Sequence, residues 1–208
     1  MTTNIREYID FLKVFQLGLE YGLLDMKIII DWADKIIHQD EIPDNFVIEL
    51  SLSGHKSVDF VITIINDYIG PQTSVLPTRV IIGLLHQGLI NGQIKLRNVT
   101  AILDGLIWKG HLTENEKTFL YGLDDELNLA ESKIHGLEKG VEEATLRFTE
   151  LYKEFRIDNP KEWNEINGTI DKKVEELYKN VITRIKNPSA FMSLQAPAKK
   201  MWWKIWKN

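Results

Sequence analysis

The stretch that decides the fold is residues 113–155, which read TENEKTFLYGLDDELNLAESKIHGLEKGVEEATLRFTELYKEF. Thr113 and Glu116 have the spacing of a capping box, in which each side chain accepts a hydrogen bond from the other residue's backbone amide. Apolar residues then recur at alternating steps of three and four over about five heptads, which keeps one stripe of a helix facing a partner. These seam positions are Leu120, Leu123, Leu127, Ala130, Ile134, Leu137, Val141, Ala144, Phe148, Leu151 and Phe155. The pattern predicts one long helix.

A second helix is predicted after Asp158-Asn159-Pro160, because proline breaks a helix interior but suits the first position of a new helix. Its seam comprises Trp163, Ile166, Ile170, Val174, Leu177, Val181 and Ile185, and Asn187-Pro188 ends it. The two helices should pair as an antiparallel hairpin, about 60 Å and about 40 Å long at ~1.5 Å per residue. The excess length of the first helix would need cover from the N-terminal helices, the tail or a second chain.

Two glycines, Gly136 and Gly140, lie one turn apart on the first predicted helix. The preferred interpretation is a tolerated pair that locally weakens the helix. The alternative is a close helix crossing or a kink.

Residues 1–111 contain a succession of shorter amphipathic patterns separated by caps and turns. Helices are predicted over about 4–21, 25–38, 43–52, 58–69, 77–89 and 98–108. In the helix over 58–69, Phe60, Ile64 and Ile65 are expected to face inward. Residues 46–52 would also suit a strand, but no partner strand is visible, so a helix is preferred. Short links make consecutive helices antiparallel neighbours, and such pairs could stack as in a solenoid, although no sequence unit repeats at a fixed period.

The predicted fold is therefore all-α, with three parts. Residues 1–111 form a multi-helix bundle, residues 112–188 the long antiparallel hairpin, and residues 189–208 a tail rich in tryptophan and lysine.

Composition removes several classes of function. The chain has 208 residues, 44% of them hydrophobic and 26% charged, the balance of an ordinary globular protein. The absence of cysteine excludes disulfides, zinc–thiolate sites, iron–sulfur clusters and thiol nucleophiles. No signal-like apolar segment opens the chain and no apolar run approaches a membrane span of ~20 residues, so a cytoplasmic location is expected. A net charge of −5 argues against nucleic-acid binding and leaves open a basic protein partner.

Catalytic and metal-binding motifs are missing from the sequence. It contains no H-E-x-x-H, no G-x-S-x-G and no phosphate-binding G-x-x-x-x-G-K-[ST]. His38-Gln39-Asp40-Glu41 could hold a metal, but a polar helix C-terminus is the preferred interpretation. Asp31 and Asp34 lie one turn apart, and a solvated helix face explains them better than acid–base chemistry. We therefore expect no catalytic site, cofactor or metal.

The tail is the most unusual local feature. Its aromatic and basic residues are Trp202, Trp203 and Trp206 with Lys199, Lys200, Lys204 and Lys207. This mixture suits a membrane interface, where indole rings lie among headgroups and lysines meet anionic lipid. The preferred alternative is that the tryptophans dock into a groove of the same protein while the lysines reach outward.

A family resemblance concerns the first 60 or so residues. It is carried by Gly22-Leu23-Leu24, the helix Ile30-Asp31-Trp32-Ala33-Asp34-Lys35-Ile36-Ile37, Pro43, and Ile48-Glu49-Leu50-Ser51-Leu52-Ser53-Gly54. This pattern resembles small helical bacterial proteins of the toxin-immunity type. The resemblance implies no enzyme activity. It implies an acidic protein that binds a cognate toxin and blocks its active site or assembly.

Two functions follow as hypotheses. The first is a non-catalytic immunity protein that binds a basic toxin through an acidic edge formed by Asp31, Asp34, Asp40, Glu41 and Asp44. The second is a structural or adaptor protein that self-associates through the hairpin and attaches to a membrane surface or a partner through its tail. An inhibitor could be a monomer, whereas an exposed heptad seam predicts a homodimer.

Overall fold

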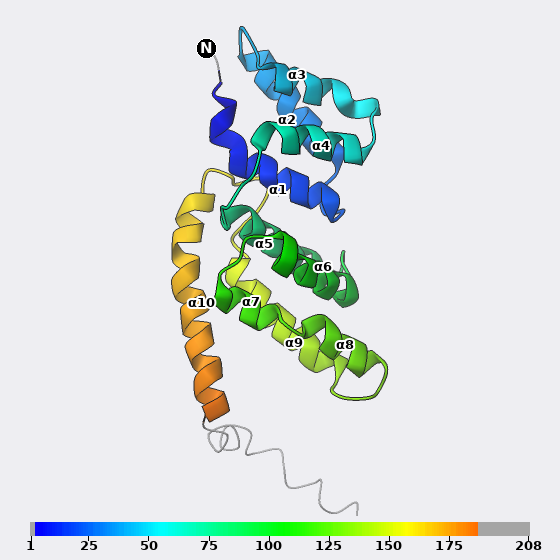
Figure 1. Ribbon diagram of the computed structural model, residues 1–208, viewed down its shortest axis with the longest axis vertical. Coiled ribbons are helices and arrows are strands. Elements are labelled where there is room, and N and C mark those ends of the chain that lie inside the picture. Colours follow the sequence, from blue (N-terminus) through cyan, green and yellow to red (C-terminus); the bar gives the residue numbers. More distant parts are fainter. Residues whose placement is uncertain (1–2, 187–208) are drawn as a thin grey trace, which may run out of the picture. The chain divides into compact units, whose positions relative to one another are not determined.

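The computed structural model describes residues 3–186, and every regular element among them is a helix (Figure 1). The predicted all-α, multi-helix fold is thus confirmed. The chain divides into two compact units, Met1–Ile170 and Asp171–Asn208. The last helix, α10 (Trp163–Lys186), begins in the first unit and continues into the second.

The first part of the chain forms four α-helices around a shared apolar core. Their bounds, with two short 3-10 helices, are η1 (Ile5–Tyr8), α1 (Ile9–Glu20), α2 (Met26–Gln39), α3 (Asn45–Ser51), η2 (Leu52–His55) and α4 (Val58–Ile69). The segment that could have been a strand is helical, and the side chains of Asp25, Asp44 and Ser57 cap α2, α3 and α4. Inward residues such as Phe15 on α1 and Ile65 on α4 have no exposed surface, and α1 packs against both α4 and α5 (Leu76–Ile90).

Helix α5 (Leu76–Ile90) is the central helix of the first unit. Its side chains are buried on nearly every side from Leu76 to Gly88, because it packs against α1, α6 (Leu96–Lys109), α9 (Glu138–Thr149) and η3 (Glu150–Tyr152). The absence of a side chain at Gly83 permits the close approach of η3 and Phe155. A Cβ at Gly83 would lie 2.6 Å from the carbonyl oxygen of Tyr152 and 2.8 Å from Cβ of Phe155.

The prediction of one continuous helix after residue 113 is wrong. The segment forms α7 (Glu114–Leu120), α8 (Leu123–Glu131), α9 (Glu138–Thr149) and η3 (Glu150–Tyr152). Gly122 has φ +85°, and Lys133 and Gly136 have φ +57° and +78°, so the backbone leaves the right-handed helical region at both breaks. These turns let α8 pack against α6 and α9 fold back on α8 (Figure 1). The hairpin in this part of the chain is therefore α8–α9.

The breaks also divide the predicted heptad seam. Leu120, Leu127, Val141 and Phe148 are buried as expected, but Ile134 and Leu137 are 72% and 77% exposed. Neither interpretation of the two glycines holds as stated. Gly136 lies in the loop between two helices, and a Cβ at Gly140, on α9, would meet no described atom within 4 Å.

A buried ion pair joins three parts of the first unit. Glu116 and Arg79 are both completely buried, and Glu116 Oε1 accepts hydrogen bonds from Arg79 Nε and the Tyr152 hydroxyl, each at 2.8 Å. Glu116 Oε2 accepts from the Thr113 backbone amide and hydroxyl, each at 2.7 Å, which confirms the predicted capping box. Arg79 Nη1 also donates to Asn167 Oδ1 at 2.8 Å. One carboxylate thus links α5, α7 and η3.

None of the helices among residues 3–186 has both the length and the apolar character required to cross a membrane. The predicted tail anchor lies outside the described residues, and it comprises Trp202, Trp203, Trp206, Lys199, Lys200 and Lys204.

Candidate partner-binding surfaces

The predicted acidic edge consists mostly of carboxylates that already have partners within the protein. Asp31 pairs with Lys27 Nζ at 2.7 Å, across one turn of α2. Asp34 accepts a hydrogen bond from the hydroxyl of Ser51 on α3. Both side chains therefore contribute to the α2–α3 region itself.

The next two members of the edge, Asp40 and Asp44, bind residues at the start of the chain and on α3 and α4. Asp40 accepts hydrogen bonds from the backbone amide and hydroxyl of Thr3, at 2.7 and 2.8 Å. Asp44 caps α3 through the amide of Phe46 and accepts from the Tyr68 hydroxyl at 3.2 Å. Substituting these carboxylates would therefore disturb the fold as well as the surface.

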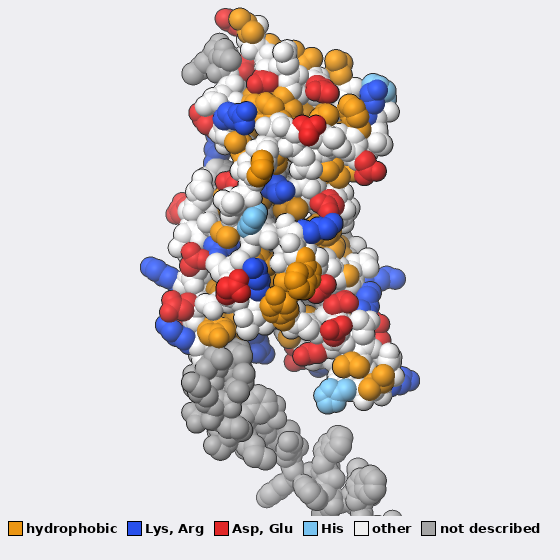
Figure 2. Space-filling view, viewed as in Figure 1, with side chains coloured by type: hydrophobic (Ala, Val, Ile, Leu, Met, Phe, Trp, Pro, Cys, Tyr) orange, Lys and Arg blue, Asp and Glu red, His pale blue; other side chains and the backbone are white. Residues whose placement is uncertain are grey.

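Two adjoining hollows lie along α3 and α4, and we call them together the α3–α4 surface. The apolar hollow, about 400 Å³, is lined by Ile48, Leu52 and Phe60 with Glu49, His55 and Lys56. The acidic hollow, about 410 Å³, is lined by Asp44, Glu49 and Asp67 with Phe46, Ile64 and Tyr68. Both hollows share Asn45 and Glu49, so apolar and acidic groups form one continuous surface. Figure 2 shows orange side chains interspersed with red ones over the part of the face where α3 and α4 lie.

The apolar side chains of the α3–α4 surface are open to solvent. Leu52 is 67% exposed and Phe60 37% exposed. The prediction that Phe60 faces inward is wrong, because Val61, Ile65 and Ile69 form the buried face of α4. One residue corresponds to about 100° of helical rotation, which turns Phe60 outward. Its ring instead lies beneath Lys56 Nζ, 5.5 Å from the centroid.

Acidic groups dominate the charge of this surface. Residues 40–69 contain six acidic side chains and one basic side chain. Glu49 and Asp67 form no ion pair with the side chains of residues 3–179, which leaves their charges uncompensated there. Burial, and then the neighbouring carboxylate of Asp44, raises the pKa of Tyr68, so the phenol stays protonated and able to donate.

The charge asymmetry between the two units extends this pattern. Residues 1–170 carry 27 acidic and 16 basic side chains, a formal net charge of −11, whereas residues 171–208 carry 3 acidic and 9 basic side chains, a net charge of +6. The overall value of −5 therefore understates how acidic the first unit is. A field of that sign favours the approach of a basic partner.

Asp31 lies in a different hollow, between α1, α2 and the segment after η3. This cleft of about 440 Å³ is lined by Phe11, Phe15 and Trp32 with Asp31, Lys35 and Asp158. The rings of Phe11 and Trp32 have centroids 5.5 Å apart. Because Asp44 faces the α3–α4 surface instead, the five predicted residues do not line a single site.

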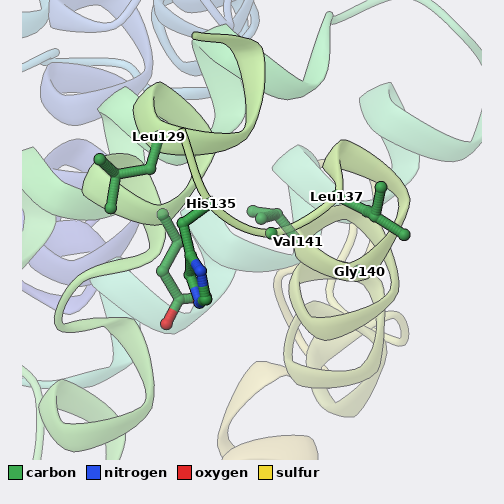
Figure 3. A pocket seen from close by; sticks show the side chains of 7 residues that line it. Leu129, His135, Leu137, Gly140 and Val141 are labelled. Carbon is green, nitrogen blue, oxygen red and sulfur yellow. The ribbon is translucent and has the colours of Figure 1, made fainter. Parts of the chain in front are cut away.

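A fourth hollow, the α8–α9 pocket, lies where the predicted long helix breaks. Its volume is about 360 Å³, and it is lined by Glu126, Leu129, His135, Leu137, Gly140 and Val141. In Figure 3, Leu129 and His135 extend from one side of the connecting loop, and Leu137, Gly140 and Val141 lie on the other side.

The described part of the chain contains no group of side chains arranged like metal ligands. Within residues 3–186 no three histidine or acidic side chains come together in a way that could hold an ion. His38, in the last turn of α2, has its Nδ1 atom 2.7 Å from the carbonyl oxygen of Asp34, as suits a polar helix end.

Comparison of the chain with protein-family models, with curated proteins and with solved structures yields no match. The functional argument therefore rests on the surfaces themselves. The exposure of the apolar residues Leu52 and Phe60 was not predicted from the sequence. For Phe60 it was predictable, because Phe60 is offset from the apolar stripe Val61–Ile65–Ile69.

Proposed function

We propose that this chain is a non-catalytic protein-binding protein whose α3–α4 surface binds a basic partner, most specifically an immunity protein that inhibits a basic toxin. The observation that supports the proposal is the juxtaposition of exposed Leu52 and Phe60 with the uncompensated carboxylates of Glu49 and Asp67. Exposed apolar groups rimmed by charge are typical of protein interaction sites. The carboxylates would steer a basic partner and set its orientation, and burial of the apolar groups would stabilise the complex.

The adaptor hypothesis has less support. It required one continuous apolar stripe on a long helix, and that stripe is divided between α7, α8 and α9. Its second requirement, attachment through the tail, concerns residues outside the described part of the chain. We therefore retain the inhibitor as the proposed function.

The test captures the partner and then asks what it does. Tagged protein is incubated with an extract of the organism that produces it, and captured proteins are identified by mass spectrometry. The α3–α4 variant carries Leu52→Ser, Glu49→Lys and Asp67→Lys, which change exposed side chains and spare the structural carboxylates of Asp40 and Asp44. We expect one basic protein that the parent chain captures and the α3–α4 variant does not.

A matched control separates this site from a general effect of charge. The variant Asp104→Lys/Glu165→Lys changes the net charge by the same amount at exposed positions on α6 and α10. It should capture the partner normally. The captured protein is then expressed in a test bacterium, where it should arrest growth, and co-expression of this chain should restore growth. A captured protein that is harmless, or restoration of growth that is equal for the α3–α4 variant, would refute the proposed function.

A further inference from the structure

The α8–α9 pocket is bordered by apolar side chains that the fold leaves open to solvent. Leu129 is 39% exposed and Leu137 77% exposed, while Val141 forms a buried part of the lining. Ile134, in the connecting loop, is 72% exposed. Ile134, Leu137 and Val141 are seam positions of the predicted long helix, and Leu129 is next to one. A continuous helix would have turned the seam toward one partner. The break in the helix therefore produces both the hollow and its apolar border.

The backbone of the loop is held in an unfavourable conformation. Lys133 has φ +57°, a left-handed value that is uncommon in residues other than glycine. A strained backbone together with exposed aliphatic side chains costs stability in the isolated chain. Exposed apolar patches mark interaction sites, and strained backbone residues cluster at ligand-binding sites.

Gly140 leaves room at the pocket for an incoming side chain. A Cβ at this position would meet no described atom within 4 Å, although Gly140 lies within α9 between the lining residues Leu137 and Val141. Glycine lowers helix stability relative to residues with a side chain. The open space at Gly140 thus permits close approach of a partner at the pocket.

The charge around the pocket indicates which kind of partner fits. Residues 114–150 contain ten acidic and four basic side chains. Glu126 lines the pocket, and Glu138 and Glu142 adjoin two of its apolar residues in sequence. These three carboxylates form no ion pair with the side chains of residues 3–179. The same face of a second copy would carry the same charge and be repelled. A basic segment would be attracted.

We propose that the α8–α9 pocket is a second docking site, which binds a basic amphipathic helix by accepting one of its large apolar side chains between Leu129, Leu137 and Val141. The carboxylates around the pocket pair with the basic residues that flank that side chain. This site is separate from the α3–α4 surface, so the chain can hold two basic segments at the same time.

The test uses a fluorescently labelled synthetic helix with lysines on one face and leucines on the other. Its binding is followed by fluorescence anisotropy, both to the parent chain and to the α3–α4 variant, because the acidic α3–α4 surface could also attract it. A peptide with glutamates in place of the lysines, and one with alanines in place of the leucines, serve as ligand controls. We expect the lysine–leucine peptide to bind both proteins and the two control peptides to bind neither.

The decisive variant is Gly140→Leu, added to each protein. The leucine should fill the pocket without harming the fold, since it replaces a helical glycine in open space. Gly168→Leu is the matched control, because Gly168 is also a helical glycine with no described atom within 4 Å of an added Cβ. We expect Gly140→Leu and Leu137→Ser each to weaken binding by about tenfold or more, the loss of roughly one buried apolar contact. Gly168→Leu should leave the affinity unchanged.

Three results would overturn this proposal. The first is that the peptide does not bind at all. Equally contrary would be equal affinity for the Gly140→Leu and Gly168→Leu forms of the α3–α4 variant. The third is a self-associated parent chain that Gly140→Leu dissociates in sedimentation experiments, which would assign the pocket to a second copy. The proposed function is tested independently, because its test changes Leu52, Glu49 and Asp67 and leaves Gly140 unchanged.

Discussion

Removing the charge of Glu116 should destabilise the protein more than any surface substitution. Its carboxylate is completely buried and accepts four hydrogen bonds, two from Thr113 and one each from Arg79 and Tyr152. Glu116→Gln replaces one acceptor oxygen by a donor NH₂ and removes the negative charge that lies against the buried Arg79 guanidinium. Breaking a buried ion pair by removing one partner costs about 3–5 kcal/mol. Since domains are stable by only about 5–15 kcal/mol, we expect the loss of a large share of the stability.

The contribution of the pair can be separated from that of the cap. Thr113→Ala removes one hydroxyl of the capping box and leaves the ion pair intact, so it should cost only about 1 kcal/mol. Arg79→Met should cost about as much as Glu116→Gln, because it leaves the Glu116 carboxylate buried beside Tyr152 without its cation. The double variant Arg79→Met/Glu116→Gln removes both charges, and its cost should be smaller than the two single costs together by about 1–3 kcal/mol.

Urea unfolding followed by far-UV circular dichroism measures these differences. The urea concentration at the midpoint of unfolding should fall in each destabilised variant. The slope of the unfolding free energy against urea concentration should stay the same. The reasoning would be refuted if the two single costs added within about 0.5 kcal/mol in the double variant. It would also be refuted if Glu116→Gln cost no more than Thr113→Ala.

Further predictions concern a histidine, two glycines and a cap. Burial lowers the pKa of His86 below its ordinary value, so the folded state disfavours the charged ring. Stability that is present above about pH 6.5 should be lost as the pH falls through the lowered pKa, and His86→Gln should reduce this loss in unfolding experiments between about pH 7 and pH 5. Gly83→Ala should lower stability by about 1–3 kcal/mol, because its Cβ would lie 2.6 Å from the carbonyl oxygen of Tyr152. Gly140→Ala, in open space on the same kind of element, should instead raise stability by about 0.5–1 kcal/mol; thermal unfolding that ranks the two glycines the other way would contradict this account. Ser57→Ala should cost about 1 kcal/mol through loss of the α4 cap, and an unchanged melting temperature would disprove that role.

Much of the helical structure could be predicted from the sequence, because helices and caps depend on residues close together in the chain. Ser57 and Asp25 cap helices through amides two or three residues away, and the capping box of Thr113 and Glu116 spans three residues. The helix Val58–Ile69 has the predicted bounds. Hydrophobic periodicity located these helices for the same reason, although it placed Phe60 on the wrong face of the helix Val58–Ile69.

Periodicity could not reveal where a long helical pattern breaks. The seam from Leu120 to Phe155 keeps its spacing through Gly122 and Gly136, and both glycines adopt left-handed conformations in the structure. Whether a glycine remains helical depends on the free energy gained when the flanking helices pack elsewhere. Here α8 packs against α6 and α9, a choice that the local sequence does not contain.

The candidate sites depended even more on tertiary structure. The sequence alone established an all-α chain rich in carboxylates, and it led us to an acidic edge whose members Asp40 and Asp44 have structural roles. Only the packing of α3 against α4 decided that Leu52 and Phe60 stay exposed beside Glu49. The same distinction holds for Glu116, whose bond to Thr113 is local but whose bond to Arg79 joins residues 37 positions apart. Local hydrogen bonds follow from the order of residues, whereas burial and long-range pairing follow from which surfaces the folded chain brings together.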